Sequence, residues 1–213
     1  MGMSRMKQEK LTEIVCIIDR SGSMGSIRDD AIGSFNTFLK DQQSLSGEAL
    51  MTIVLFDDQY EIMHNGTRIG YVPLLTTKTY VPRGSTALFD AIGRTINDVK
   101  SRISKTEDQR KIPDNVIVAI LTDGEENAST EFNLSQIESM IKNQIKKDQW
   151  NFVCLSADPK AFEDAGKIGI VRDNVVRFEA DSEGIQDCCR QMNAVCCNIR
   201  TDAVPKRRKK SKA

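Results

Sequence analysis

One acidic and two hydroxyl side chains follow a short apolar run near the N-terminus, at alternate positions of the chain. The run 14–18 is followed by Asp19, and Ser21 and Ser23 come next, just before a helical pattern begins. In a tight turn, residues two apart can direct their oxygens toward one point. One carboxylate and two alcohols suit a hard divalent cation, Mg2+ above all, whereas zinc prefers sulfur and nitrogen.

Strand and helix patterns alternate along the chain, and this alternation places the oxygen-bearing residues. Strands are predicted at 14–18, 50–56, 60–67, 116–121, 150–155 and 175–178. Helices are predicted at 26–43, 86–103, 134–147, 161–168 and 183–200. One hairpin within repeated strand–helix units indicates an α/β fold, with a mostly parallel sheet and helices on both faces.

Two further oxygen side chains are predicted to reach the same edge of this sheet. Thr86 ends the loop before the second long helix, and Asp123 follows the strand at 116–121. Ligands of open α/β sheets bind at the carboxyl ends of the strands, near the switch point of strand order. We therefore expect five side chains to converge on one cation: Asp19, Ser21, Ser23, Thr86 and Asp123.

These residues resemble the metal-ion-dependent adhesion site (MIDAS) of the von Willebrand factor A family. The motif is Asp19-x-Ser21-x-Ser23, then Thr86 within 84–92, then Asp123 within 121–124, and the similarity covers about 13–200. The resemblance implies a doubly wound, six-stranded, Rossmann-like sheet with one antiparallel edge strand, for which 60–67 is the candidate. We expect an N-terminal extension at 1–12, the A domain at 13–201 and a basic tail at 202–213.

The resemblance also implies roles for these side chains. Ser21 and Ser23 would ligate Mg2+ or Mn2+ directly, Thr86 would do so when a partner is engaged, and Asp19 and Asp123 would act through water or as switchable ligands. Neutral hydroxyls leave much of the charge of the cation uncancelled, so an acidic residue of a partner protein can complete the shell. The expected function is metal-dependent protein binding, as an adhesion or scaffold module without catalysis. Residues expected at the partner-binding rim are Arg20, Met24, Ser85, Glu125 and Glu126.

Other readings of the same residues stay open. A serine can simply cap a helix and an aspartate can end a strand. Phosphate binding at Gly22 and Gly25 is disfavoured because no Gly-Lys-Ser/Thr follows. A metal-dependent phosphoesterase or nuclease would use Asp19 and Asp123, although serines stand where two-metal chemistry needs acids. His64, the one histidine, falls on the predicted hairpin strand, which argues against a Ser-His-Asp triad.

Composition fits a folded domain with a separate charged end. The 213 residues are 39% apolar and 28% charged, with 30 basic and 30 acidic side chains. No apolar run is long enough to span a bilayer and the first residues lack a signal-peptide core, so we expect a cytoplasmic protein, or a nuclear one in a eukaryote. Six of the basic residues are Lys206, Arg207, Arg208, Lys209, Lys210 and Lys212.

The basic tail is expected to be disordered, because it repels itself and has little apolar surface to bury. It could serve as a nuclear-import signal, a nucleic-acid tether or a solubilising segment. With no aromatic residue between the charges, base stacking is not implied.

The six cysteines do not predict a zinc site. Cys16 and Cys154 lie in apolar runs, and the pairs at 188–189 and 196–197 fall on a helical pattern. Cys189 and Cys196 would be about 10 Å apart along the helix axis, too far for one zinc with Zn–S bonds of about 2.3 Å. We expect reduced, core-facing thiols.

Overall fold

The computed structural model describes residues 10–157, 170 and 174–202. Its strands are β1 (Thr12–Asp19), β2 (Ala49–Phe56), β3 (Tyr60–Arg68), β4 (Asn115–Thr122), β5 (Asn151–Ser156) and β6 (Val175–Arg177). Its α-helices are α1 (Arg28–Ser44), α2 (Leu88–Ser104), α3 (Leu134–Asp148) and α5 (Ser182–Asp202). Short 3-10 helices are η1 (Gly22–Ile27), η2 (Ile69–Tyr71) and η3 (Gln109–Lys111). The helix predicted at 161–168, the first nine residues and 203–213 lie outside the described part.

The six strands form one sheet in the order β3-β2-β1-β4-β5-β6. β3 is antiparallel to β2, and every other neighbouring pair is parallel. This confirms the predicted doubly wound α/β fold with one antiparallel edge strand. The strand order reverses on the two sides of β1, so the switch point lies between β1 and β4, where a ligand site is expected.

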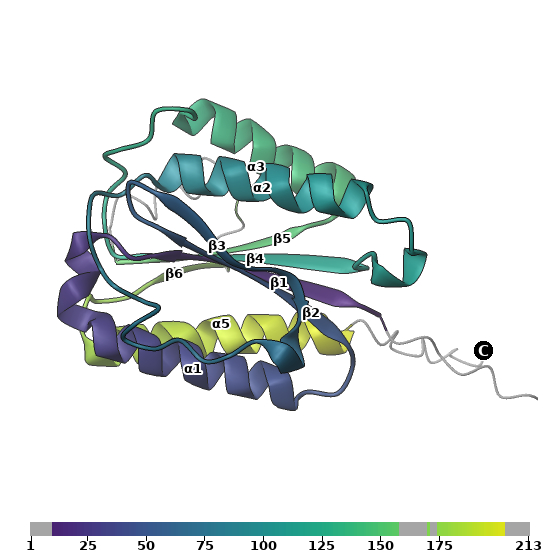
Figure 1. The fold of residues 1–213 in the computed structure, drawn as a ribbon, viewed down its shortest axis with the longest axis horizontal. Helices are drawn as coiled ribbons and strands as arrows, with labels where there is room; N and C mark the ends of the chain where they lie inside the picture. Colours follow the sequence, from purple (N-terminus) through teal and green to yellow (C-terminus); the bar gives the residue numbers. More distant parts are fainter. Residues whose placement is uncertain (1–9, 158–169, 171–173, 203–213) are drawn as a thin grey trace, which may run out of the picture.

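Helices cover both faces of the sheet, α1 and α5 on one side and α2 and α3 on the other (Figure 1). The alternation of side chains along β1 explains this layering, because successive side chains point to opposite faces. Ile14, Cys16 and Ile18 pack in the cluster with α1 and α5, whereas Val15 and Ile17 pack with α2 and α3. Every residue of β1 is buried.

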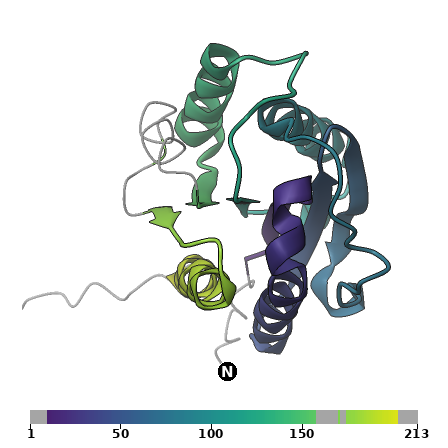
Figure 2. The ribbon, with the colours of Figure 1, turned by 90° about the vertical axis from the view of Figure 1, so that its left-hand side faces the viewer.

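The carboxyl ends of β4, β5 and β6 point toward the viewer in Figure 2. The view therefore looks onto the carboxyl ends of the strands, where the site is predicted. The helical segment that follows β1 divides into η1 and α1 instead of forming one helix from residue 26. η1 therefore begins at Gly22, inside the predicted motif.

The cysteines lie where the sequence placed them. All six are free thiols and five are buried; Cys16, Cys188 and Cys196 lie in the core cluster with α1 and α5, and Cys154 lies in the cluster on the other face. Burial raises the pKa of Cys189 and Cys196 to about 12, which keeps these thiols protonated and unreactive at neutral pH.

His64 lies half-buried on the edge strand β3, where it pairs with Ile53 of β2. Within the described ranges, no helix is long and apolar enough to cross a membrane.

Candidate functional site

Three sequence-distant segments meet at the carboxyl edge of the sheet. β1 ends at Asp19 and is followed by Ser21 and by Ser23 in η1, β4 ends at Thr122 and is followed by Asp123, and the loop before α2 carries Thr86. Because β1 and β4 are parallel neighbours, Ile18 lies beside Leu121 and both strands end at the same level. This register is what brings the two predicted acidic residues together.

Four of the predicted side chains are in contact or share one point. The Ser23 hydroxyl donates to Asp123 Oδ1 at 2.7 Å, and the hydroxyl oxygens of Ser21 and Ser23 are 3.1 Å apart. A Cβ at Gly124 would lie 3.4 Å from Thr86 Oγ1 and 3.5 Å from Ser23 Oγ. The two hydroxyls therefore flank the same position, and glycine at 124 leaves it open.

Asp19 lies directly beneath this group and is fully buried. Its Oδ1 accepts from the backbone N–H of Ser21 and its Oδ2 from the hydroxyl of Thr122, both at 2.6 Å. Burial raises the pKa of Asp19 to about 6; the hydrogen bonds from Thr122 and Ser21 act against this rise, and the charge of Asp123 adds to it. Burial likewise raises the pKa of Asp123.

The donor set fits a hard divalent cation. It consists of two carboxylates and three hydroxyls, with no sulfur or nitrogen, as Mg2+ and Mn2+ prefer. Neither Asp19, which is fully buried, nor Asp123, which is half-buried, takes part in any ion pair among the described residues. A buried carboxylate such as Asp19 without a cationic partner is costly. In the described part of the chain, the site included, no three His, Cys, Asp or Glu side chains gather as metal ligands would, so a cation here depends on the hydroxyls as well as on the two carboxylates.

Hydrogen bonding also orients the hydroxyl of Ser23. A serine oxygen can ligate a cation only if its proton points away from the ion. Ser23 directs its proton to Asp123 and accepts from the hydroxyl of Ser21, which leaves one lone pair to face the space beside Gly124.

Backbone contacts hold the loop that carries Thr86 against the turn after β1. The N–H of Gly22 donates to the carbonyl of Gly84 at 3.2 Å, and the N–H of Arg83 donates to the carbonyl of Arg20 at 2.8 Å. Gly84 has a φ of 65°, in the left-handed region that favours glycine. These bonds fix the position at which Thr86 enters the site.

A buried ion-pair network reinforces the same junction, and sequence reasoning missed it. Asp57 is fully buried and accepts from Arg20 Nε at 3.0 Å and from Arg83 Nε at 2.9 Å. Glu61 accepts from Arg20 Nη1 at 2.6 Å. Burial alone would raise the pKa of Asp57, but the bonds from Arg83, Gln59 and Arg20 outweigh it and hold the pKa below its ordinary 3.8.

Glu126 organises the loop after β4. Its Oε1 accepts from the N–H groups of Ala128 and Ser129, at 2.9 and 2.7 Å, and its Oε2 from the N–H of Phe89 at 2.9 Å. The side chain thus links this loop to the start of α2, close to Thr86. The sequence does not reveal this role, because it depends on contact between the loop after β4 and the start of α2, 37 positions earlier in the chain.

The predicted rim residues divide into two groups. Met24 is fully buried and Arg20 is 5% exposed, so both side chains support the loop from below. Ser85 and Glu125 are exposed beside the site, and their contact with a partner stays a prediction.

No protein-family model and no curated protein matches the chain. Solved structures do match. Proximal thread matrix protein 1 from the mussel byssus has a TM-score of 0.61 and 15% identity, over 88% of this chain and 46% of that one. A von Willebrand factor type A structure from Catenulispora acidiphila has a TM-score of 0.55 and 16% identity, over 87% of this chain and 42% of that one. The fold is von Willebrand factor A-like.

A further structure with this A-like fold is the mussel matrix protein described with a zinc-occupied MIDAS motif. It has a TM-score of 0.57 and 14% identity, over 89% of this chain and 46% of that one. The chain thus spans less than half the length of each of these three structures. At these identities the likeness concerns the fold, while the site is argued from the contacts above.

Proposed function

We propose that this chain is a metal-dependent protein-binding module that holds Mg2+ or Mn2+ at its carboxyl edge. The observation that carries the proposal is the convergence of Ser21, Ser23, Thr86, Asp19 and Asp123 from three separate segments. The zinc-occupied motif of the mussel protein supports a divalent cation at this place in the fold.

The hydroxyls of Ser21, Ser23 and Thr86 would ligate the ion, and Asp123 would keep the Ser23 proton directed away from it. Asp19, held by Ser21 and Thr122, would balance the charge from below. When bound, the cation supplies an electrophilic position for an oxygen ligand from outside the chain. All three direct ligands would be neutral hydroxyls, and the two carboxylates would act from outside the shell. The open position on the cation would therefore still attract a carboxylate of a partner protein.

The first experiment measures cation uptake by the full chain with isothermal calorimetry, using Mg2+ and Mn2+ in turn. We expect one ion per chain. Ser21→Ala and Ser23→Ala each remove a direct ligand and should weaken binding by at least about 10- to 100-fold, the loss that already follows when groups that only orient metal ligands are removed. Ser46→Ala is the matched control, because Ser46 is exposed on the loop after α1. Absence of uptake, or equal uptake by all four proteins, would overturn the proposal.

A second experiment tests the carboxylate receptor. In the Mn2+-loaded chain, the relaxation rate of the water protons should fall when acetate is added, because a carboxylate oxygen displaces water bound to Mn2+. The rate should stay unchanged when neutral acetamide is added. Equal effects of the two compounds would refute carboxylate binding. Rapid hydrolysis of a generic phosphoester with Mn2+, abolished by Asp19→Asn, would instead establish the phosphoesterase alternative.

A further inference from the structure

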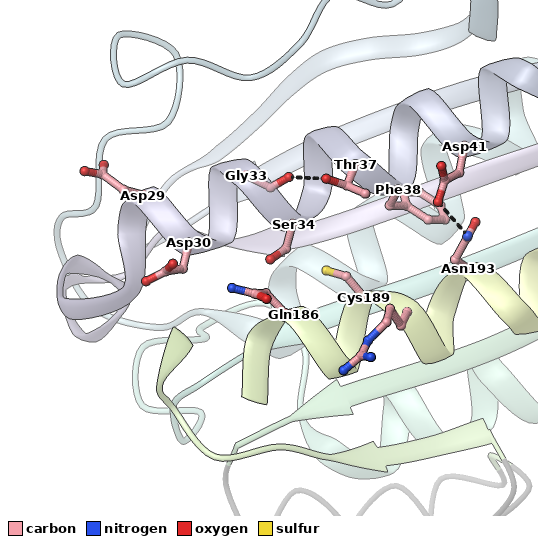
Figure 3. Close-up of a pocket in the computed structure, with 11 residues that line it drawn as sticks. Asp29, Asp30, Gly33, Ser34, Thr37, Phe38, Asp41, Gln186, Cys189 and Asn193 are labelled. Atoms are coloured by element: carbon pink, nitrogen blue, oxygen red, sulfur yellow. Dashed lines mark hydrogen bonds between the residues drawn. The ribbon is translucent and has the colours of Figure 1, made fainter. Parts of the chain in front are cut away.

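The two helices on one face of the sheet leave a groove of about 470 Å3 between them (Figure 3). α1 and α5 run side by side, as the contact between Gln42 Nε2 and Asn193 Oδ1 at 2.6 Å shows. The groove walls carry three carboxylates, Asp29, Asp30 and Asp41, against one guanidinium, Arg190. Its charge is therefore negative overall.

A buried hydroxyl in this groove lacks a hydrogen-bond partner. Ser34 is 8% exposed, and its Oγ makes no hydrogen bond with any described residue. Figure 3 shows its side chain directed from α1 toward Gln186 and Cys189 of α5. Beside it, a Cβ at Gly33 would meet no atom within 4 Å, so the space is open. A buried hydroxyl without a partner is unfavourable, which indicates that a polar group from elsewhere completes it, and its lone pairs can accept a hydrogen bond.

The three carboxylates have acceptor capacity left. Asp41 accepts from Asn193 at 2.9 Å, and Asp30 accepts from Ser182 at 2.8 Å. Among the described residues, the exposed Asp29 pairs only with its half-buried neighbour Arg28. Within the described residues, one oxygen of each aspartate accepts no hydrogen bond, so the groove offers acceptors and needs donors.

We propose that this groove binds the chain's own basic segment at 206–212. Lysine and arginine side chains carry only donors and positive charge, which complements three carboxylates and an orphan hydroxyl. Six of these seven residues are basic. The groove would thus hold the tail against α1 and α5, apart from the proposed cation site at the end of the sheet.

The length of chain beyond α5 allows this placement. From Asp202, the last residue of α5, back to Asn193 is about 14 Å along the helix axis, at 1.5 Å per residue. The eleven residues 203–213 reach up to about 36 Å when extended. Lys206 therefore reaches the Asp41 end of the groove, and later lysines reach toward Asp30. Because the tail is tethered to one wall, its effective concentration at the groove is of millimolar order.

The proposal is tested by carbodiimide coupling of lysines to carboxylates in the dilute full chain, followed by peptide mass spectrometry. We expect couplings within one chain from the tail lysines to Asp29, Asp30 and Asp41. Couplings mainly between chains, or spread equally over exposed acids such as Glu107, would overturn it.

Charge variants sharpen the test. Asp29→Asn should lower coupling at Asp41 about two- to fivefold, the factor that corresponds to one exposed ion pair. Glu107→Gln removes the same charge outside the groove and should leave coupling unchanged. At 1 M salt, where the Debye length falls to about 3 Å, the coupling of the tail lysines should fall at all three groove aspartates.

A second readout needs no coupling chemistry. The backbone amide resonances of Gly33 and Ser34 should shift when Lys206, Lys209 and Lys210 are together changed to Gln in the full chain. Resonances on α3, across the sheet, should not. Unchanged groove resonances in this triple variant would refute the proposal even if the coupling result were positive.

Discussion

Replacing Asp57 by asparagine should strongly destabilise the fold, because this carboxylate neutralises a buried arginine. The side chain of Asp57 is fully buried and that of Arg20 is 6% exposed. The substitution keeps an acceptor for the N–H of Gln59 but leaves Arg20 with only Glu61, which is 50% exposed. Arg83 is half-exposed and would turn toward solvent at little cost.

The magnitude follows from these exposures. Breaking a buried ion pair by removing one partner costs about 3–5 kcal/mol, and since Glu61 remains we expect the lower end, about 3 kcal/mol. For a domain of this size, that corresponds to a Tm about 6–12 °C lower. Thermal and urea unfolding of the full chain measure both quantities. Asp58→Asn is the matched control, an exposed neighbour whose change should stay within about 0.5 kcal/mol.

A double variant separates charge from packing. Changing Arg20→Met together with Asp57→Asn removes both charges, so most of the stability lost in Asp57→Asn should return. If Asp57→Asn matched Asp58→Asn, or if the double variant were less stable than either single one, the buried-charge reasoning would be refuted.

The same network predicts a pH dependence. The pKa of Asp57 is lowered on folding, so its stabilisation is present above the ordinary value of 3.8 and is lost as the pH falls through the lower folded value. The stability difference between wild type and Asp57→Asn should therefore be full at neutral pH and shrink only below 3.8. A difference that already disappeared at pH 6 would contradict this assignment.

Two further predictions concern packing. Gly184→Ala should destabilise by about 1–3 kcal/mol, because its Cβ would clash with the carbonyl oxygen of Glu179. Gly33→Ala, in open space on α1, should instead stabilise by about 0.5–1 kcal/mol. Urea unfolding checks both, and equal effects would show that the close approach does not matter. Iodoacetamide at pH 8 should label the half-buried Cys197 first and Cys189 only on unfolding, because burial raises the pKa of Cys189 to about 12; early labelling of Cys189 would disprove its burial.

The sequence alone determined the local parts of the site. Residues two apart after a strand are close whatever the rest of the chain does, so Asp19, Ser21 and Ser23 could be grouped directly. The apolar run before Asp123 predicted a strand covered on both faces, and parallel strands end at one edge, which brought Asp123 to the same place. For the same reason the six-stranded α/β fold could be predicted, since alternating patterns allow few topologies.

Only the tertiary structure decided the roles that depend on partners far along the chain. Asp57 and Asp58 look alike in sequence, yet one is buried between two arginines and the other is exposed, because the turn between β2 and β3 directs one side chain inward. Met24 is buried because η1 begins inside the motif and turns it toward the core. The acidic groove exists only where α1 and α5, some 150 residues apart, pack side by side. Local spacing cannot determine such contacts, because they depend on how distant elements are placed against each other.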